Sequence, residues 1–153
     1  MNSSFVEAAH QADGRYLSDQ ELRPLEMYLT TFATRMEAYQ TLRDNADSLV
    51  MQALRRLVPT HRRVVQEHGG KCKRDMAYTL SYVARAVLSD DTNAFRQDFL
   101  LWMGNIAHAL HKSDSSSEAY GCLKQEIHDT LPPQCAVLVT PYLDELINTF
   151  SHQ

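Results

Sequence analysis

The residues with the clearest capacity for chemistry stand together where a helix is predicted to begin. Lys71, Cys72, Lys73, Arg74 and Asp75 follow one another directly. A thiol can hold a ligand covalently, a carboxylate can accept hydrogen bonds from N–H groups, and the cations can pair with carboxylates. The cluster therefore suits a ligand that offers a reactive side chain, N–H donors and acidic substituents.

Helical geometry is expected to place part of this cluster on one face. Steps of three and four residues return to the same side of a helix, so Cys72, Asp75, Thr79 and Tyr82 are expected to align. Cationic neighbours and a place near a helix N-terminus are expected to make the thiol more reactive. On the residues alone, the favoured interpretation is a solvated basic helix start with an incidental cysteine.

Apolar spacing predicts helices along most of the chain. Apolar residues recur in steps of three and four over 22–57, 76–87, 95–110, 120–127 and 135–150, as on the buried face of an amphipathic helix. No segment shows the sustained alternation of a half-buried strand. The pattern predicts an all-α fold of roughly seven or eight helices.

Local signals suggest where these helices begin and end. Ser18 and Glu21 form a capping box, and Ser115 with Glu118 is predicted to form a second one after a polar linker over 113–117. We expect a break at Asp44-Asn45, an end at Pro59 and a turn at Gly69-Gly70. The helix after Thr92 is expected to turn six apolar side chains toward the core: Phe95, Phe99, Trp102, Met103, Ile106 and Leu110.

Composition excludes several classes of protein. The 153 residues suit one domain with a core, and no apolar run approaches the ~20 residues of a membrane span. Seven of the 15 Lys and Arg residues lie between Arg55 and Arg74, but without interleaved stacking aromatics they do not indicate nucleic-acid binding. The sequence shows no catalytic triad or phosphate-binding loop, so we predict no enzyme. Cys122 and Cys135 have apolar neighbours and are expected in the core.

Three ordered segments resemble one known family. Cys72-Lys73-Arg74-Asp75, with Tyr78 and Leu80, resembles the C-x-R-D-x-x-Y-x-L stretch of phycobiliproteins, the light-harvesting proteins of cyanobacterial and red-algal phycobilisomes. The segment 12–18 with Glu21-Leu22 resembles the beginning of allophycocyanin-type subunits. Residues 40–42, 44–45 and 50–53 continue the similarity, which extends from about residue 9 to residue 91.

The resemblance implies an architecture and a setting. It implies a globin-like helical bundle in one domain over 1–153, with an N-terminal docking helix (1–17) and a core (18–153). Family subunits pair through the N-terminal part, so Asp13, Arg15 and Tyr16 would contact a phycobiliprotein-like subunit, another phycobilisome component or a second copy. The expected location is the cytoplasmic face of the thylakoid membrane.

The resemblance also implies a cofactor, a linear tetrapyrrole such as phycocyanobilin. Cys72 would form a thioether to its ring A, and Asp75 would accept hydrogen bonds from the pyrrole N–H groups. Arg74 would pair with a propionate, with Lys71 or Lys73 assisting. Tyr78 would lie near the pigment, and Tyr82 completes the predicted set.

The sequence departs from the family pattern in ways that leave alternatives open. The segment between Ala53 and Cys72 is several residues shorter than usual, Thr79 stands where Tyr is frequent, and Ser81 stands where Arg is frequent. Because that arginine normally meets the N-terminal aspartate, Asp13 would lack its usual partner. One alternative is a pigment-free interaction module for phycobilisome assembly or regulation, and another is a transient bilin carrier or lyase-like protein.

Overall fold

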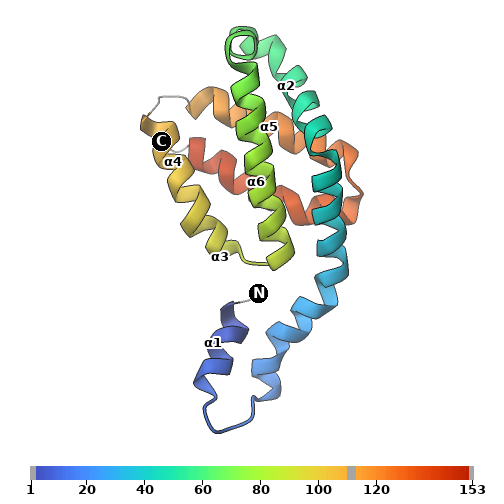
Figure 1. The fold of residues 1–153 in the computed structure, drawn as a ribbon, viewed down its shortest axis with the longest axis vertical. Helices are drawn as coiled ribbons and strands as arrows, with labels where there is room; N and C mark the ends of the chain where they lie inside the picture. Colours follow the sequence, from blue (N-terminus) through green and yellow to red (C-terminus); the bar gives the residue numbers. More distant parts are fainter. Residues whose placement is uncertain (1–2, 110–112, 152–153) are drawn as a thin grey trace.

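The computed structural model describes residues 3–109 and 113–151, and within these ranges the chain is helical with no strand (Figure 1). The prediction of an all-α fold is confirmed. The elements in chain order are α1 (Ser3–Gln11), α2 (Asp19–Ser89), α3 (Thr92–Ala94), the π-helical turn η1 (Phe95–Leu100), α4 (Leu101–Ala109), α5 (Ser113–Thr130) and α6 (Pro133–Ser151).

Helix α2 forms a hairpin that organises the bundle. It runs along one side of the molecule, reverses at one end and returns beside its first half (Figure 1). The backbone leaves helical geometry at His61 (φ −134°, ψ 47°) and at His68 (φ −130°, ψ 15°). Pro59 remains inside the helix, so the predicted end at Pro59 is wrong by two residues, and the predicted turn at Gly69-Gly70 follows the second break directly.

The predicted break at Asp44-Asn45 is wrong, because α2 continues through these residues. The Asn45 amide donates to the Thr41 carbonyl at 2.8 Å, so this polar side chain is satisfied within the helix. Leu42 and Leu49 are each 1% exposed. Burial of apolar residues before and after the polar pair therefore overrides its local preference for a turn.

The core lies between the two halves of α2 and the helices α5 and α6, which also pack against each other. Its largest fully buried side chains come from all of these elements and from η1: Leu42, Leu49, Val50, Leu57, Leu80, Val83, Phe99, Leu123, Ile127, Val139, Leu143 and Leu146. This burial, at roughly 25 cal/mol per Å² of apolar surface, is the main source of stability.

Three predictions about the second half of the chain are wrong. Helix α5 begins at Ser113, so the predicted polar linker over 113–117 is helical, and Glu118 bonds His61 on α2 instead of capping its own helix at Ser115. Trp102, expected in the core, is 51% exposed. Leu110 and the side chain of Ile106, both predicted in the core, lie outside the part of the chain that the structure describes.

We call residues 3–34, which comprise α1, the following turn and the first part of α2, the N-terminal arm. It stands apart from α3–α6 (Figure 1). The Ser18 hydroxyl accepts from the Glu21 amide at 3.2 Å, which confirms the predicted cap. The Glu21 carboxylate instead pairs with Arg15 at 3.2 Å. Large apolar side chains remain exposed on the arm: Val6, Met27 and Leu29.

Arg35 joins the arm to the returning half of α2. It is 2% exposed, and its guanidinium donates to the Thr31 hydroxyl at 3.0 Å and to the carbonyls of Tyr28 and Leu88. The same group lies over the Tyr28 ring at 4.1 Å from the centroid. A single buried cation thus holds two segments that are more than fifty residues apart in the sequence.

We expect Arg35→Met to lower the free energy of unfolding by about 2–4 kcal/mol, because it removes a buried guanidinium that donates to two part-buried carbonyls. Urea unfolding followed by circular dichroism measures the change. Arg43→Met is the matched control, since Arg43 is exposed and pairs with the adjacent Asp44, and it should behave like the unmodified chain. Equal effects of the two substitutions would contradict the joint.

Candidate functional site

The reversal of α2 leaves a cavity of about 520 Å³ between α2, α4, α5 and α6. Its volume lies in the range of cavities that bind small molecules and cofactors, about 300–1,000 Å³. Most of the lining is apolar or aromatic, with a few polar groups among it. The lining residues are Leu57, Val64, His68, Lys71, Cys72, Asp75, Met76, Tyr78, Trp102, Met103, Ser115, Ser116, Ala119, Tyr120 and Phe150.

Four of the seven residues predicted to bind the cofactor line this cavity, namely Lys71, Cys72, Asp75 and Tyr78. They lie in the turns of α2 that follow the break at His68, where helical steps of three and four residues bring Cys72 and Asp75 to one side. The structure therefore places a thiol, a carboxylate and an ammonium group beside one largely apolar space.

The other three predicted residues do not line the cavity. Arg74 is exposed and Lys73 is half-buried. Tyr82 lies behind the lining, with its ring 5.3 Å from that of Tyr78 and stacked on Phe99 at 4.7 Å between centroids. Tyr82 thus supports the orientation of Tyr78, while Arg74 and Lys73 carry charge outside the cavity.

A buried polar contact lies next to the cavity, and the sequence pattern did not predict it. Thr79 is fully buried, and its hydroxyl donates to the Asp75 carbonyl at 2.9 Å. Because that bond uses the only hydroxyl proton of Thr79, the Tyr120 hydroxyl, 2.9 Å away, must donate to Thr79. The contact fixes α5 against the turn of α2 that carries Asp75. In the sequence Tyr120 shows only the spacing of a core residue.

Burial raises the pKa of Tyr120 to about 12. The negative charges that Asp75 and Cys72 can carry act in the same direction as burial. Tyr120 therefore stays neutral through the physiological range. It presents a hydroxyl that donates into the protein and a ring that lines the cavity.

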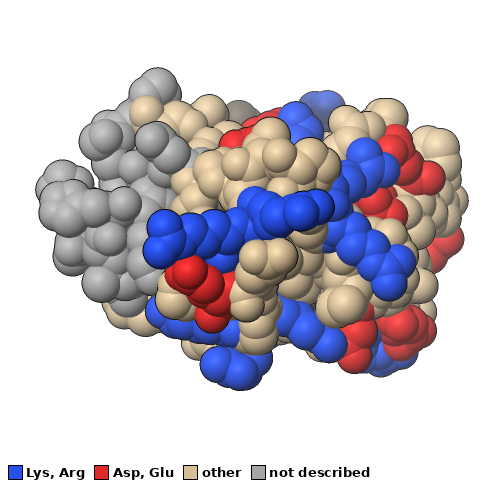
Figure 2. Space-filling model, turned by 90° about the horizontal axis from the view of Figure 1, so that it is seen from above, with Lys and Arg blue, Asp and Glu red and all other residues tan. Residues whose placement is uncertain are grey.

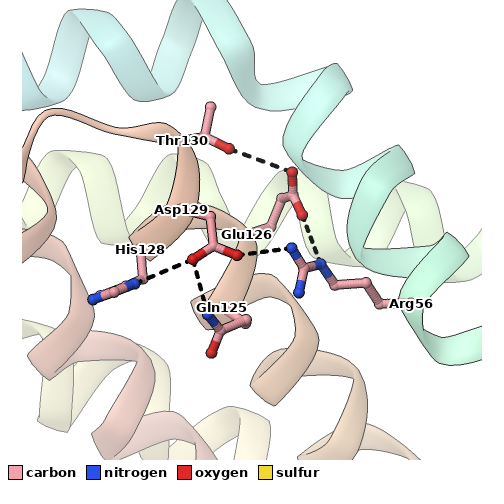
Figure 3. A network of polar contacts seen from close by, with 6 residues as sticks. All are labelled: Arg56, Gln125, Glu126, His128, Asp129 and Thr130. Atoms are coloured by element: carbon pink, nitrogen blue, oxygen red, sulfur yellow. Dashed lines mark hydrogen bonds and ion pairs between the residues drawn. The ribbon is translucent and has the colours of Figure 1, made fainter.

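Polar contacts on the outside hold α5 to the corner of α2. Arg56 donates to Glu126 at 2.7 Å and to Asp129 at 2.9 Å (Figure 3). Hydrogen bonds from His128 and Arg56 lower the pKa of Asp129. At the corner itself His61 bonds Glu118, and hydrogen bonds from Thr60 and His61 lower the pKa of that carboxyl. These exposed pairs fix geometry more than they add stability.

The three cysteines occupy different surroundings, and none of them forms a disulfide. Cys135 is fully buried, and Cys122 is half-buried against the core, as predicted. Burial raises the pKa of both thiols, which makes them poor nucleophiles. Cys72 is the cysteine that borders the cavity.

Among the residues that the structure describes, no helix has the length and apolar character needed to cross a membrane. The same part of the chain contains no group of three or more His, Cys, Asp and Glu residues that could hold a metal ion.

The structure thus defines a class of protein, a helical bundle whose longest helix presents a thiol and a carboxylate to an apolar cavity. The sequence matches the phycobilisome protein family over residues 6–150, and the chain belongs to that family. The predicted family and its globin-like all-α fold are confirmed. The match also continues well beyond residue 91, where the resemblance of the motifs fades.

The chain is similar to allophycocyanin and phycocyanin subunits over most of its length. It is 25% identical to the allophycocyanin alpha-B chain of Cyanidium caldarium, covering 99% of this chain and 98% of that one. It is 25% identical to the C-phycocyanin beta chain of Porphyra purpurea, covering 91% of each. Identity reaches 29% with the C-phycocyanin-2 beta subunit of Microchaete diplosiphon, over 61% of this chain and 60% of that one.

Because the pKa of Tyr120 is raised, we expect the folded chain to lose stability against unfolding at alkaline pH. A folded-state pKa above the usual value of 10 means that the folded chain keeps a proton which the unfolded chain releases. The contribution is fully present below pH 10 and disappears as the pH rises to about 12. Urea midpoints measured across this interval should fall less steeply in Tyr120→Phe than in the unmodified chain.

Tyr16→Phe is the control for this experiment, because Tyr16 is 98% exposed. It should retain the full steepness of the unmodified chain. A Tyr120→Phe profile that coincides with the control would contradict the assigned burial and hydrogen bonding of Tyr120.

Proposed function

We propose that the chain holds a linear tetrapyrrole, a bilin of the phycocyanobilin type, in the cavity through a thioether to Cys72. The observation that carries this proposal is that Cys72 and Asp75 border the same largely apolar space. Family membership supports it, because the motif that contains both residues resembles the attachment segment of phycobiliproteins.

The residues present fit such a group. A bilin offers a reactive side chain, pyrrole N–H donors, two carboxylates and a flat conjugated skeleton. Cys72 supplies the nucleophile, Asp75 the acceptor for N–H groups, and Lys71 a cation for a carboxylate. The aromatic part of the lining suits the skeleton. The bilin itself would supply the absorption of visible light, which no side chain provides.

The remaining predicted residues would support the pigment, one from the cavity lining and three from outside the cavity. Arg74 and Lys73 would pair with whatever part of the propionates extends beyond the cavity. Tyr78 would border the pigment and Tyr82 would hold Tyr78 in place. By restraining the tetrapyrrole and excluding water, the cavity would slow non-radiative decay. The protein would then serve energy transfer or photoprotection in a phycobilisome at the cytoplasmic face of the thylakoid membrane, as a pigment protein and not an enzyme.

Co-expression with phycocyanobilin-producing enzymes and candidate lyases tests the attachment site. The unmodified chain should give a zinc-fluorescent band on a denaturing gel, and Cys72→Ala should lose it while its helical circular-dichroism spectrum stays unchanged. Cys122→Ala is the control, because Cys122 does not line the cavity. A band that persists in Cys72→Ala would overturn the assigned site.

A second candidate function, a pigment-free interaction module, is favoured by the N-terminal arm. Met27 and Leu29 are each 62% exposed, and Tyr16 is 98% exposed. Such apolar exposure is typical of surfaces that a partner covers. Asp13 and Tyr16 would project toward a phycobiliprotein-like subunit or a second copy, while Arg15 is engaged by Glu21. A colourless chain that binds such a subunit would favour this function over pigment binding.

Release of the pigment to an acceptor would distinguish a transient bilin carrier from a pigment protein. A carrier would pass its pigment to an apo-subunit added in excess, and the zinc-fluorescent band would move to the acceptor. A pigment protein would keep the band through the same incubation.

One prediction about the N-terminal arm as a contact surface holds whether or not the chain carries pigment. Leu29→Glu should raise the Kd for an allophycocyanin-type subunit more than about tenfold, because it replaces an exposed apolar side chain of the proposed contact surface with a charge. Analytical ultracentrifugation of the mixed proteins measures this Kd. Thr30→Glu adds the same charge at the neighbouring exposed position and should have a smaller effect. Identical affinities for the two variants would exclude the arm as the contact surface.

A further inference from the structure

We propose that Trp102 is the side chain that stacks against the conjugated plane of the ligand and limits its twisting. This inference rests on the proposed function and adds a residue that the attachment motif does not contain. Trp102 lies on α4, distant in the sequence from Cys72 and Asp75 on α2, yet it lines the same cavity.

The exposure of Trp102 is the first observation. Its spacing after Phe95 and Phe99 predicts a core position, but the side chain is 51% exposed at the cavity. A large indole left half in solvent forgoes stabilisation that burial would give. Packing of the described residues therefore does not account for its place, whereas a ligand in the cavity would cover it.

The backbone before Trp102 explains how it reaches the cavity. The chain forms a π-helical turn over Phe95–Leu100, and the Leu101 amide donates to the Arg96 carbonyl, five residues earlier. Such a turn contains one more residue than an α-helical turn, so every later side chain is rotated relative to the simple α-helical pattern. Accordingly Leu100 and Gly104 are buried, while Leu101 and Trp102 lie outside the core.

A second aromatic side chain meets the same space from the other helix. Tyr78 on α2 is 53% exposed and lines the cavity. Its ring contacts Tyr82, which stacks on Phe99 at 4.7 Å within the π-helical turn. A continuous aromatic row thus connects the Tyr78 wall to the element that positions Trp102. Two half-exposed aromatic rings beside an acidic acceptor fit a flat conjugated ligand with N–H donors.

Binding without the covalent bond tests this stacking directly. Phycocyanobilin is titrated into Cys72→Ala, and the emission of Trp102, the only tryptophan of the chain, is recorded. We expect quenching that saturates, and a Kd, followed by pigment absorption, that rises roughly two- to tenfold in Cys72→Ala/Trp102→Leu. Trp102→Phe should restore most of the affinity, because it keeps an aromatic face.

Leu101→Ala is the matched control. Leu101 precedes Trp102, is 65% exposed and does not line the cavity, so its loss should leave the Kd unchanged. In the pigmented protein with Cys72 intact, Trp102→Leu should keep the zinc-fluorescent band but lower the fluorescence yield. A retained band together with a lowered yield would show that Trp102 restrains the bound pigment and is not needed for its attachment or for folding.

The outcomes distinguish the two proposals. If Trp102→Leu matches the unmodified chain in affinity and fluorescence yield while a pigment band is present, stacking by Trp102 is overturned and the proposed function stands. If neither a band nor quenching occurs in any variant, the proposed function fails and the stacking falls with it. Deletion of the exposed Gln97 provides a second test, since it should return η1 to an α-helical turn, shift Trp102 emission to shorter wavelength and abolish quenching.

Discussion

The reversal of α2 between His61 and His68 is the constraint on which the site depends. If the helix ran straight, Leu57 and Cys72 would lie more than about 20 Å apart at 1.5 Å per residue, whereas the reversal brings both to one cavity. The reversal is held from outside by α5, through Arg56 (Figure 3) and also through the contact of His61 with Glu118. The position of the Cys72 thiol thus depends on the contacts that hold the reversal of α2 against α5.

Charge is distributed unevenly over the fold. The corner of α2 carries Lys and Arg side chains across its outer surface, as the view onto that end shows (Figure 2). Some of this charge is already neutralised, as in the pair of Arg63 with Glu67. Beneath this polar exterior the cavity is mainly apolar. The buried hydroxyls next to it are satisfied, since Tyr120 donates to Thr79 and Thr79 donates to the Asp75 carbonyl. A ligand in the cavity would meet a mainly apolar lining with few polar groups, which is how recognition sites obtain orientation as well as affinity.

The sequence is informative wherever one local pattern decides the outcome. The helical class, the Ser18 cap and the pairing of Cys72 with Asp75 all follow from spacing within one or two turns. Spacing fails where distant contacts intervene. Helix α2 continues through Asp44-Asn45 because buried leucines lie on both sides, and Glu118 leaves its own helix terminus to bond His61. Trp102 is misplaced because one π-helical turn changes the register, and nothing in the residues over 95–100 announces that turn.

Arg35 couples the N-terminal arm to the end of α2. Its acceptors lie on both sides of the joint, at Tyr28 and Thr31 on the arm and at Leu88 in the last turn of α2. Two residues beyond Leu88, Asp90 ends the helix in a left-handed conformation (φ 52°, ψ 45°). The arm is therefore fastened to the last turn of α2, directly before the short connection that leads into α3.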